Sequence, residues 1–201
     1  MEDTKETYYQ SLFELAAALN SARAPDAVLQ SIVEGVTKTM GAKGCSLMLL
    51  SPDRKVLFHT VACGLSDWCM RKGPVLADKS ISEALAGRPI AVFDATGDLR
   101  IQYREQAKKE GIMSILSVPM TLREEIIGVT RVYTAERRSF TVDDMYFVGG
   151  VANLGAIALE NARLYEAVNK DYETFRQDML EWRAALGYEW EIGESVTPLE
   201  G

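Results

Sequence analysis

The feature that most constrains this chain is a long proline-free stretch that carries a heptad repeat. No proline lies between Phe140 and Pro198, and because proline interrupts helices, one helix can run over residues 142–186. Alternating spacings of four and three residues place a set of side chains on one helical face. This seam consists of Leu154, Ala158, Asn161, Tyr165, Val168, Tyr172, Phe175, Met179, Trp182 and Leu186.

The seam predicts an interface. We expect its early part, up to about Tyr165, to pack on the chain's own domain, whereas the later aromatic residues need cover from elsewhere. An N-terminal helix over 7–21 repeats the same spacing at Tyr8, Leu12, Leu15 and Leu19. Two chains would then form a four-helix core. The predicted homodimer interface comprises Leu12, Leu15, Leu19, Tyr165, Tyr172, Phe175, Met179 and Trp182.

The remaining periodicities predict an α+β fold. A second helix starts at Pro25 and ends near Gly41. Short apolar runs bounded by turn residues predict strands, and adjacent strands joined by tight turns favour antiparallel pairing. The predicted strands cover residues 45–50, 56–62, 89–94, 113–122 and 125–133, with a helix over 101–110 and irregular chain over 64–79.

Charge and composition exclude several classes of protein. The chain has 22 basic and 29 acidic residues, a net charge of −7, whereas nucleic-acid binders usually carry a basic excess. No uninterrupted apolar run is long enough to span a membrane. The acidic, polar N-terminus is unlike a signal peptide, so we expect a cytoplasmic protein with three reduced cysteines. Residues 170–201 hold eight acids and three bases, which marks an acidic C-terminal tail.

Four motifs in order resemble the GAF family of small-molecule sensor domains. They are the strand segments Ser114–Met120 and Ile127–Val129, the helix entry Phe140–Asp144 and the helix ending Ala156–Glu166. The resemblance covers about residues 26–168. It implies a GAF/PAS-like fold, in which an antiparallel sheet of five or six strands carries the N- and C-terminal helices on one face and a ligand pocket on the other.

The resemblance divides the chain but does not identify a ligand. It implies an N-terminal helix over 1–24, a sensor domain over 25–168 and a helical extension with an acidic tail over 169–201. Similar domains bind cyclic nucleotides, tetrapyrroles, haem, metal ions or small metabolites, so the cofactor remains unknown. The resemblance also implies an unidentified small-molecule ligand and a downstream signalling protein. From the net negative charge we expect no nucleic-acid or membrane partner.

The individual reactive residues favour a protein without catalytic activity. His59 is the only histidine; it could be an axial haem ligand, but we favour an ordinary strand residue. Cys63 and Cys69 are structural thiols or a redox-responsive pair, and Met70 replaces the histidine that follows the cysteine of bilin-binding relatives. A small redox enzyme is a weaker alternative. The chain lacks the GxGxxG and GxxxxGK[ST] phosphate-binding motifs.

The cyclic-nucleotide motif of similar domains is only partly present. Phe140 and Asp144 match it, but Met145 stands in place of the glutamate and Tyr133-Thr134 in place of the Asn-Lys pair. We therefore disfavour cyclic-nucleotide binding.

Arg131 is the most informative single residue. It lies within an apolar strand, on the face that period-two alternation assigns to Ile127, Val129 and Tyr133. A guanidinium among apolar residues must find an acceptor or reach water. It could bind a carboxylate or phosphate of a ligand, or it could pair with a carboxylate of the protein. The predicted ligand-binding residues are Gly64, Leu65, Trp68, Phe93, Asp94, Ile101, Tyr103, Arg131 and Tyr133.

Two hypotheses for function follow from the sequence. The first is a sensory domain that binds a small molecule and signals through a dimer of long helices. The alternative is a non-enzymatic dimerisation or interaction protein in which the pocket is vestigial. Retention of a small molecule during purification would separate the two.

Overall fold

The computed structural model describes residues 2–19, 25–71, 73–77 and 81–185. The contacts divide the chain into two units, residues 1–162 and 163–201. The long helix α6, Val142–Ala185, runs through both units. The predicted helix had the same first residue, and Leu186 lies outside the described residues.

Six antiparallel strands form one sheet in the first unit. Their order is β3-β2-β1-β6-β5-β4, which confirms the predicted fold class. The bounds are β1 Gly44–Leu50, β2 Val56–Cys63, β3 Val75–Leu76, β4 Ile90–Val92, β5 Ser114–Leu122 and β6 Glu125–Thr134. Strand β3 was not predicted, because a strand of two residues is too short to show a period-two pattern.

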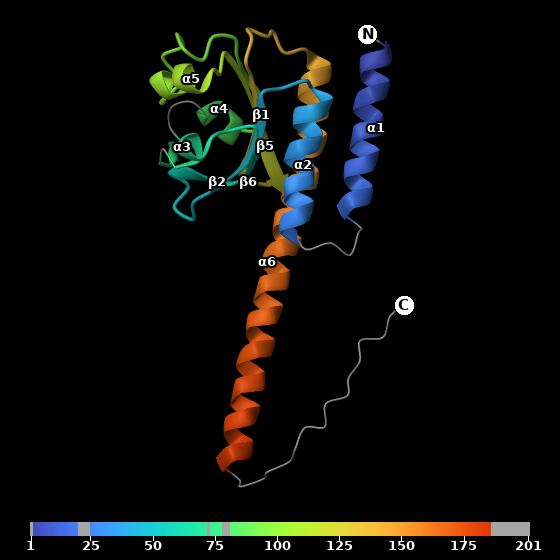
Figure 1. Cartoon of the computed structure of the whole chain (residues 1–201), viewed down its shortest axis with the longest axis vertical. Helices are drawn as coiled ribbons and strands as arrows, with labels where there is room; N and C mark the ends of the chain where they lie inside the picture. Colours follow the sequence, from blue (N-terminus) through green and yellow to red (C-terminus); the bar gives the residue numbers. More distant parts are fainter. Residues whose placement is uncertain (1, 20–24, 72, 78–80, 186–201) are drawn as a thin grey trace. The chain divides into compact units, whose positions relative to one another are not determined.

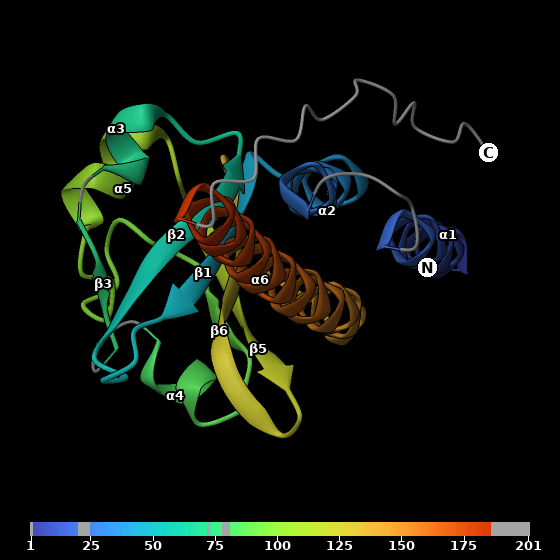
Figure 2. The same ribbon diagram turned by 90° about the horizontal axis from the view of Figure 1, so that it is seen from below.

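Helices cover the sheet differently on its two faces (Figures 1 and 2). Helices α1, Glu2–Leu19, and α2, Pro25–Thr39, lie side by side on the same side as the first part of α6. The opposite face carries the short helices α3, Asp67–Met70, α4, Ser82–Leu85, and α5, Arg104–Glu110. We call these the helical face and the cavity face of the sheet.

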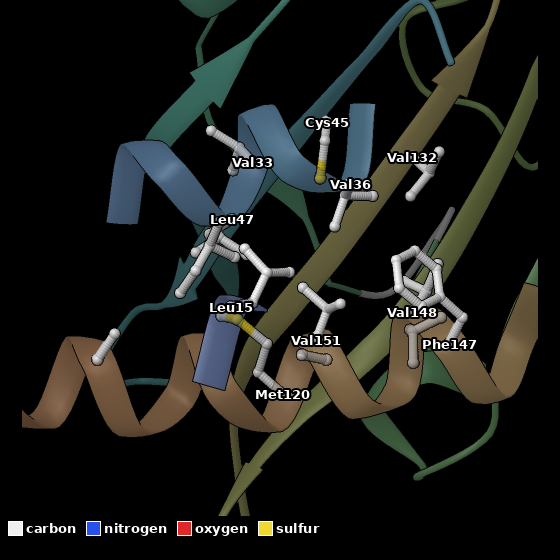
Figure 3. Packing of buried hydrophobic residues seen from close by; sticks show 14 of the residues in the cluster. Leu15, Val33, Val36, Cys45, Leu47, Met120, Val132, Phe147, Val148 and Val151 are labelled. Atoms are coloured by element: carbon white, nitrogen blue, oxygen red, sulfur yellow. The ribbon is translucent and has the colours of Figure 1, made fainter. Parts of the chain in front are cut away.

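The core on the helical face is aliphatic. Figure 3 shows Val33 and Val36 of α2, Leu47 of β1, and Val148 and Val151 of α6 converging in it. All five side chains are fully buried. Burial of side chains of this size stabilises a fold by about 1.5–3 kcal/mol each, so this core holds the helical layer against the sheet.

Helix α1 packs on its own domain. Leu15 is 6% exposed, and it approaches α2 so closely that a Cβ at Gly35 would lie 2.8 Å from its Cδ2. Leu12 approaches α6 at Gly150 in the same way, and Leu19 packs against the same core. The structure therefore buries Leu15 in the core of its own domain instead of a dimer core. Leu12 and Leu19 are only partly buried, so their place in a dimer interface stays a prediction.

A buried polar cluster ties α1 to the start of α6. The Tyr8 hydroxyl donates to Asp144 Oδ1 at 2.5 Å, and Arg138 Nη2 donates to the same oxygen at 2.8 Å. Asp144 and Thr141 also cap the helix reciprocally, because each backbone N–H donates to the other's side chain. Burial, aided by Asp144, raises the pKa of Tyr8 to about 12. The cluster joins helices that are remote in sequence.

Two register shifts change which residues share a face. The shift between Leu47 and Met48 leaves Leu57 in the cavity-face core but turns Val61 and Cys63 toward the helical face. The shift between Met120 and Thr121 turns Ile127 toward the helical face, away from Val129. Each bulge inserts a residue and so reverses the alternation. The predicted face is therefore corrected for Ile127, which does not share a face with Val129.

The side chains of helix α6 are partly buried in its first half and exposed in its second half. Its last buried residue is Leu159, and every described side chain from Arg163 to Trp182 is exposed. Packing on the domain thus ends before Tyr165, earlier than the heptad pattern alone predicted. Residues 142–182 contain an 18-residue window of mean hydropathy 1.2, apolar enough to cross a membrane by length and composition, but half of that window is buried inside the protein.

Candidate functional site

A small internal cavity lies on the cavity face of the sheet. It is lined by Val75, Ile101, Gln102, Tyr103, Ala107, Ile112, Ile115, Arg131 and Tyr133. Its volume is about 20 Å³, which is room for one water molecule. The floor comes from β5 and β6, and the walls come from β3, from α5 and from the chain before α5.

Arg131 supplies the positive charge at this cavity. It lies opposite Ser46 of β1 and Ser117 of β5, and its Nε donates to Ser117 Oγ at 3.1 Å. The hydroxyl of Tyr133 contacts Arg131 and shares a 3.0 Å hydrogen bond with Ser46 Oγ. Arg131 is only 5% exposed. A row of hydroxyls therefore holds a buried guanidinium in place.

The electrostatics follow from burial. Desolvation lowers the pKa of Arg131, and the neighbouring Tyr133 partly offsets that effect. Desolvation likewise raises the pKa of Tyr133, opposed by the charge of Arg131. A planar guanidinium can donate two parallel hydrogen bonds to a carboxylate or phosphate. The arrangement can therefore recognise an anion against an apolar wall.

Four of the predicted ligand-binding residues meet at the cavity. They are Ile101, Tyr103, Arg131 and Tyr133. Sequence reasoning missed Val75, Gln102, Ala107, Ile112 and Ile115. Gln102 stands between two predicted residues, and its Oε1 accepts from the backbone N–H of Leu76 at 2.8 Å. That contact could not be inferred, since β3 itself had not been recognised.

Three other predicted residues lie around the entry to α3. Gly64 has φ +71°, and a Cβ there would overlap the carbonyl of Lys43, so its role in the structure is close backbone packing. Leu65 packs against the cavity-face core. Trp68 is 49% exposed, with the Lys109 ammonium 5.9 Å from its ring centroid. These three residues do not line the cavity, so their part in ligand binding stays a prediction.

Phe93 and Asp94 also lie away from the cavity lining. Phe93 is 53% exposed. Asp94 accepts from Thr96 Oγ1 at 2.7 Å and from Arg137 Nη2 at 2.7 Å. These hydrogen bonds, that of Thr96 first, lower the pKa of Asp94 to about 2. In this conformation Asp94 stabilises a turn, and a ligand-binding role for it also stays a prediction.

The other reactive residues do not assemble at the cavity. His59 lies opposite Met48 on β2, and neither Cys63 nor Cys69 lines the cavity. Among the side chains that the structure describes, no group of three or more His, Cys, Asp or Glu residues could hold a metal ion. The cavity thus offers one cation, hydroxyls and apolar walls.

Comparison with known sequences supports the same fold. A family model described as "GAF domain" matches residues 22–160. That range includes all six strands, α2 and the part of α6 that packs on the sheet. No curated protein matches the chain.

Solved structures of similar fold come from several bacteria. The GAF domain of a phosphoenolpyruvate-protein phosphotransferase from Coxiella burnetii is 19% identical, with a TM-score of 0.71 over 81% of this chain and 98% of that one. Free methionine-R-sulfoxide reductase from Neisseria meningitidis is 16% identical, with a TM-score of 0.63 over 79% and 91%. The PixJ GAF domain of Thermosynechococcus elongatus is 14% identical, with a TM-score of 0.57 over 75% and 93%. At these identities the likeness is one of fold.

Proposed function

The chain belongs to the GAF domain family, and we propose that it is a non-enzymatic sensory module that binds a small anion and signals through a dimer of its α6 helices. The observation that carries the proposal is the burial of Arg131 at the cavity. Keeping a cation out of water is costly. A ligand carboxylate or phosphate could accept two parallel hydrogen bonds from this guanidinium and so offset that cost.

The size of the cavity limits what binds without rearrangement. Because about 20 Å³ holds one water molecule, a ligand of several heavy atoms requires the covering segments to move. Ile101, Gln102 and Tyr103 belong to a short connection before α5. Tyr103 Oη donates to the carbonyl of Pro74 at 3.0 Å, which closes one side of the cavity. Ligand entry from this side would break this hydrogen bond.

A short path joins the cavity to α6. Strand β6, which carries Arg131, ends at Thr134, and α6 starts at Val142. The connection between them is held by Arg138, whose Nη1 donates to the carbonyl of Met40 at 2.7 Å and whose Nη2 donates to Asp144. A shift of β6 on ligand binding would therefore be passed to the first turn of α6.

The exposed seam of the second unit supports a dimer. Tyr165, Tyr172, Phe175, Met179 and Trp182 are all at least 40% exposed. Their spacing suits a coiled coil with a second copy of the helix. Covering each side chain contributes about 1.5–3 kcal/mol, which is enough in sum to exceed the cost of association.

Ligand binding is tested by native mass spectrometry of protein purified from its own host. We expect a retained small anion in the parent. Arg131→Met keeps the length of the side chain but removes its charge, and loss of a charged hydrogen bond should weaken binding by about 10- to 100-fold. Arg88→Met, at an exposed position, makes the same change in net charge and should bind like the parent.

Dimerisation is tested by sedimentation equilibrium. Phe175→Asp places a charge on the seam and should shift the parent dimer to monomer at micromolar concentration. Thr174→Asp adds the same charge one residue off the seam and should leave the dimer intact. A monomeric parent would overturn the dimer proposal. A dimer that retains no small molecule and binds none would instead favour the alternative function, an interaction protein with a vestigial pocket. The small volume of the cavity is the observation that supports this alternative.

A further inference from the structure

Two cysteines face each other directly across neighbouring strands. Cys45 of β1 and Cys63 of β2 are register partners in the antiparallel pair. Residues directly opposite in such a pair have Cα atoms about 4.5 or 5.5 Å apart, depending on their place in the hydrogen-bond pattern. Both values fall within the range of about 4.4–6.8 Å that a disulfide spans.

Both side chains point to the same face of the sheet. Cys45 is fully buried in the helical-face core, where Figure 3 shows it beside Val36, and Cys63 packs against that core. The bulge in β2 is what turns Cys63 to this face. The backbones also meet closely here, since a Cβ at Gly44 would lie 2.5 Å from the carbonyl oxygen of Cys63.

The two thiols differ in their access to solvent. Cys63 is half-buried, whereas Cys45 is shielded from solvent. Burial raises the pKa of the Cys45 thiol, and the neighbouring Cys63 raises it further. An oxidant would therefore meet Cys63 first, and Cys45 would stay protonated until a reactive sulfur lies beside it.

We propose that Cys45 and Cys63 are a redox-modification site that forms a cross-strand disulfide when the protein meets a peroxide. The Cys63 thiolate attacks one oxygen of hydrogen peroxide, and the O–O bond breaks to give a sulfenic acid and hydroxide, which takes a proton from solvent and leaves as water. The Cys45 sulfur then attacks the Cys63 sulfur. The S–O bond breaks, the Cys45 proton goes to the leaving hydroxide, and a second water is released.

Cys69 is the matched control within the same chain. It is buried on α3 and influences the pKa of Tyr133 in the cavity-face core. It therefore faces different surroundings from the Cys45–Cys63 pair, and the disulfide does not require it. The proposal is independent of any ligand at Arg131.

Peptide mapping without reduction tests the site. The reduced full-length protein is treated with hydrogen peroxide, remaining thiols are alkylated after unfolding, and the chain is cleaved at Lys and Arg and before Asp. Cleavage at Arg54 separates Cys45 from Cys63, and cleavage before Asp67 separates Cys63 from Cys69. We expect one linked pair of peptides, containing Cys45 and Cys63, with the mass lowered by two hydrogen atoms and with Cys69 alkylated.

Variants make the result decisive. Cys63→Ser should reduce the linked pair to background, and Cys69→Ala should leave it unchanged. Both variants keep Cys45 in the core, and Cys69→Ala adds no polar group at a buried position. The proposal is overturned if Cys63 links to Cys69 or to another chain, or if Cys63 is oxidised or capped while Cys45 is recovered as an alkylated thiol.

Discussion

The buried carboxylate of Asp144 offers the sharpest test of how the helical layer is held together. Its side chain accepts hydrogen bonds from the Tyr8 hydroxyl, from Arg138 and from the backbone N–H of Thr141. Asp144→Ala removes all three and leaves the Tyr8 hydroxyl buried without its acceptor. Breaking one side of a buried ion pair costs about 3–5 kcal/mol.

For Asp144→Ala we expect a cost at the lower end of this range of about 3–5 kcal/mol. The Arg138 side chain is 31% exposed and still donates to the carbonyl of Met40, so its charge remains partly solvated. We expect a loss of about 3 kcal/mol in the free energy of unfolding. With a urea dependence of about 2 kcal/mol per molar, the midpoint should fall by about 1.5 M.

Urea denaturation at a fixed protein concentration measures this loss, and the adjacent acid is the control. Asp143 forms an exposed ion pair with Lys5 at 3.5 Å, so Asp143→Ala should change stability by less than about 0.5 kcal/mol. Equal midpoints for the two variants would refute the role assigned to Asp144.

The same carboxylate predicts a pH dependence. Burial acts to raise the pKa of Asp144, but the hydrogen bonds from Tyr8 and Thr141 and the charge of Arg138 together lower it below 3.8. A depressed folded-state pKa stabilises the fold above the pKa of the unfolded chain. That contribution is lost as the pH falls through the folded value. The stability difference between the parent and Asp144→Ala should therefore narrow below about pH 4.

Three further predictions follow from single contacts. Leu15→Asp should lower the thermal unfolding midpoint sharply, because it buries a charge in the domain core. An unchanged midpoint together with weaker dimerisation would show instead that Leu15 belongs to the dimer interface. Gly128→Ala should cost about 1–3 kcal/mol in urea denaturation, since its Cβ would overlap the carbonyl of Met48, and parent-like stability would contradict that clash. In Arg137→Ala, the pKa of Asp94 measured by NMR should rise above its value of about 2 but stay below the ordinary one, because Thr96 still donates; an unmoved pKa would exclude the Arg137 contact.

Local pattern was sufficient for most of the fold. Proline and glycine bounded α2, the absence of proline allowed the long helix α6, and apolar runs between turn residues located the five longer strands. Four ordered motifs indicated the family. Even the charge at the cavity could be anticipated, because an arginine among apolar strand residues is conspicuous in a sequence. These features depend on residues that are close together along the chain, and the spacing of such residues can be read from the sequence.

The tertiary structure decided which faces meet. Two bulges moved Val61, Cys63 and Ile127 to the helical face, and no local pattern marks an inserted residue. The heptad spacing of Leu12 and Leu15 is compatible with packing on a second chain and equally with packing on α2 and α6 of the same chain. Only the tertiary structure shows that Leu15 approaches α2 and Leu12 approaches α6. Cys63 likewise meets Cys45, distant in sequence, because strand register brings together residues that sequence spacing leaves unrelated.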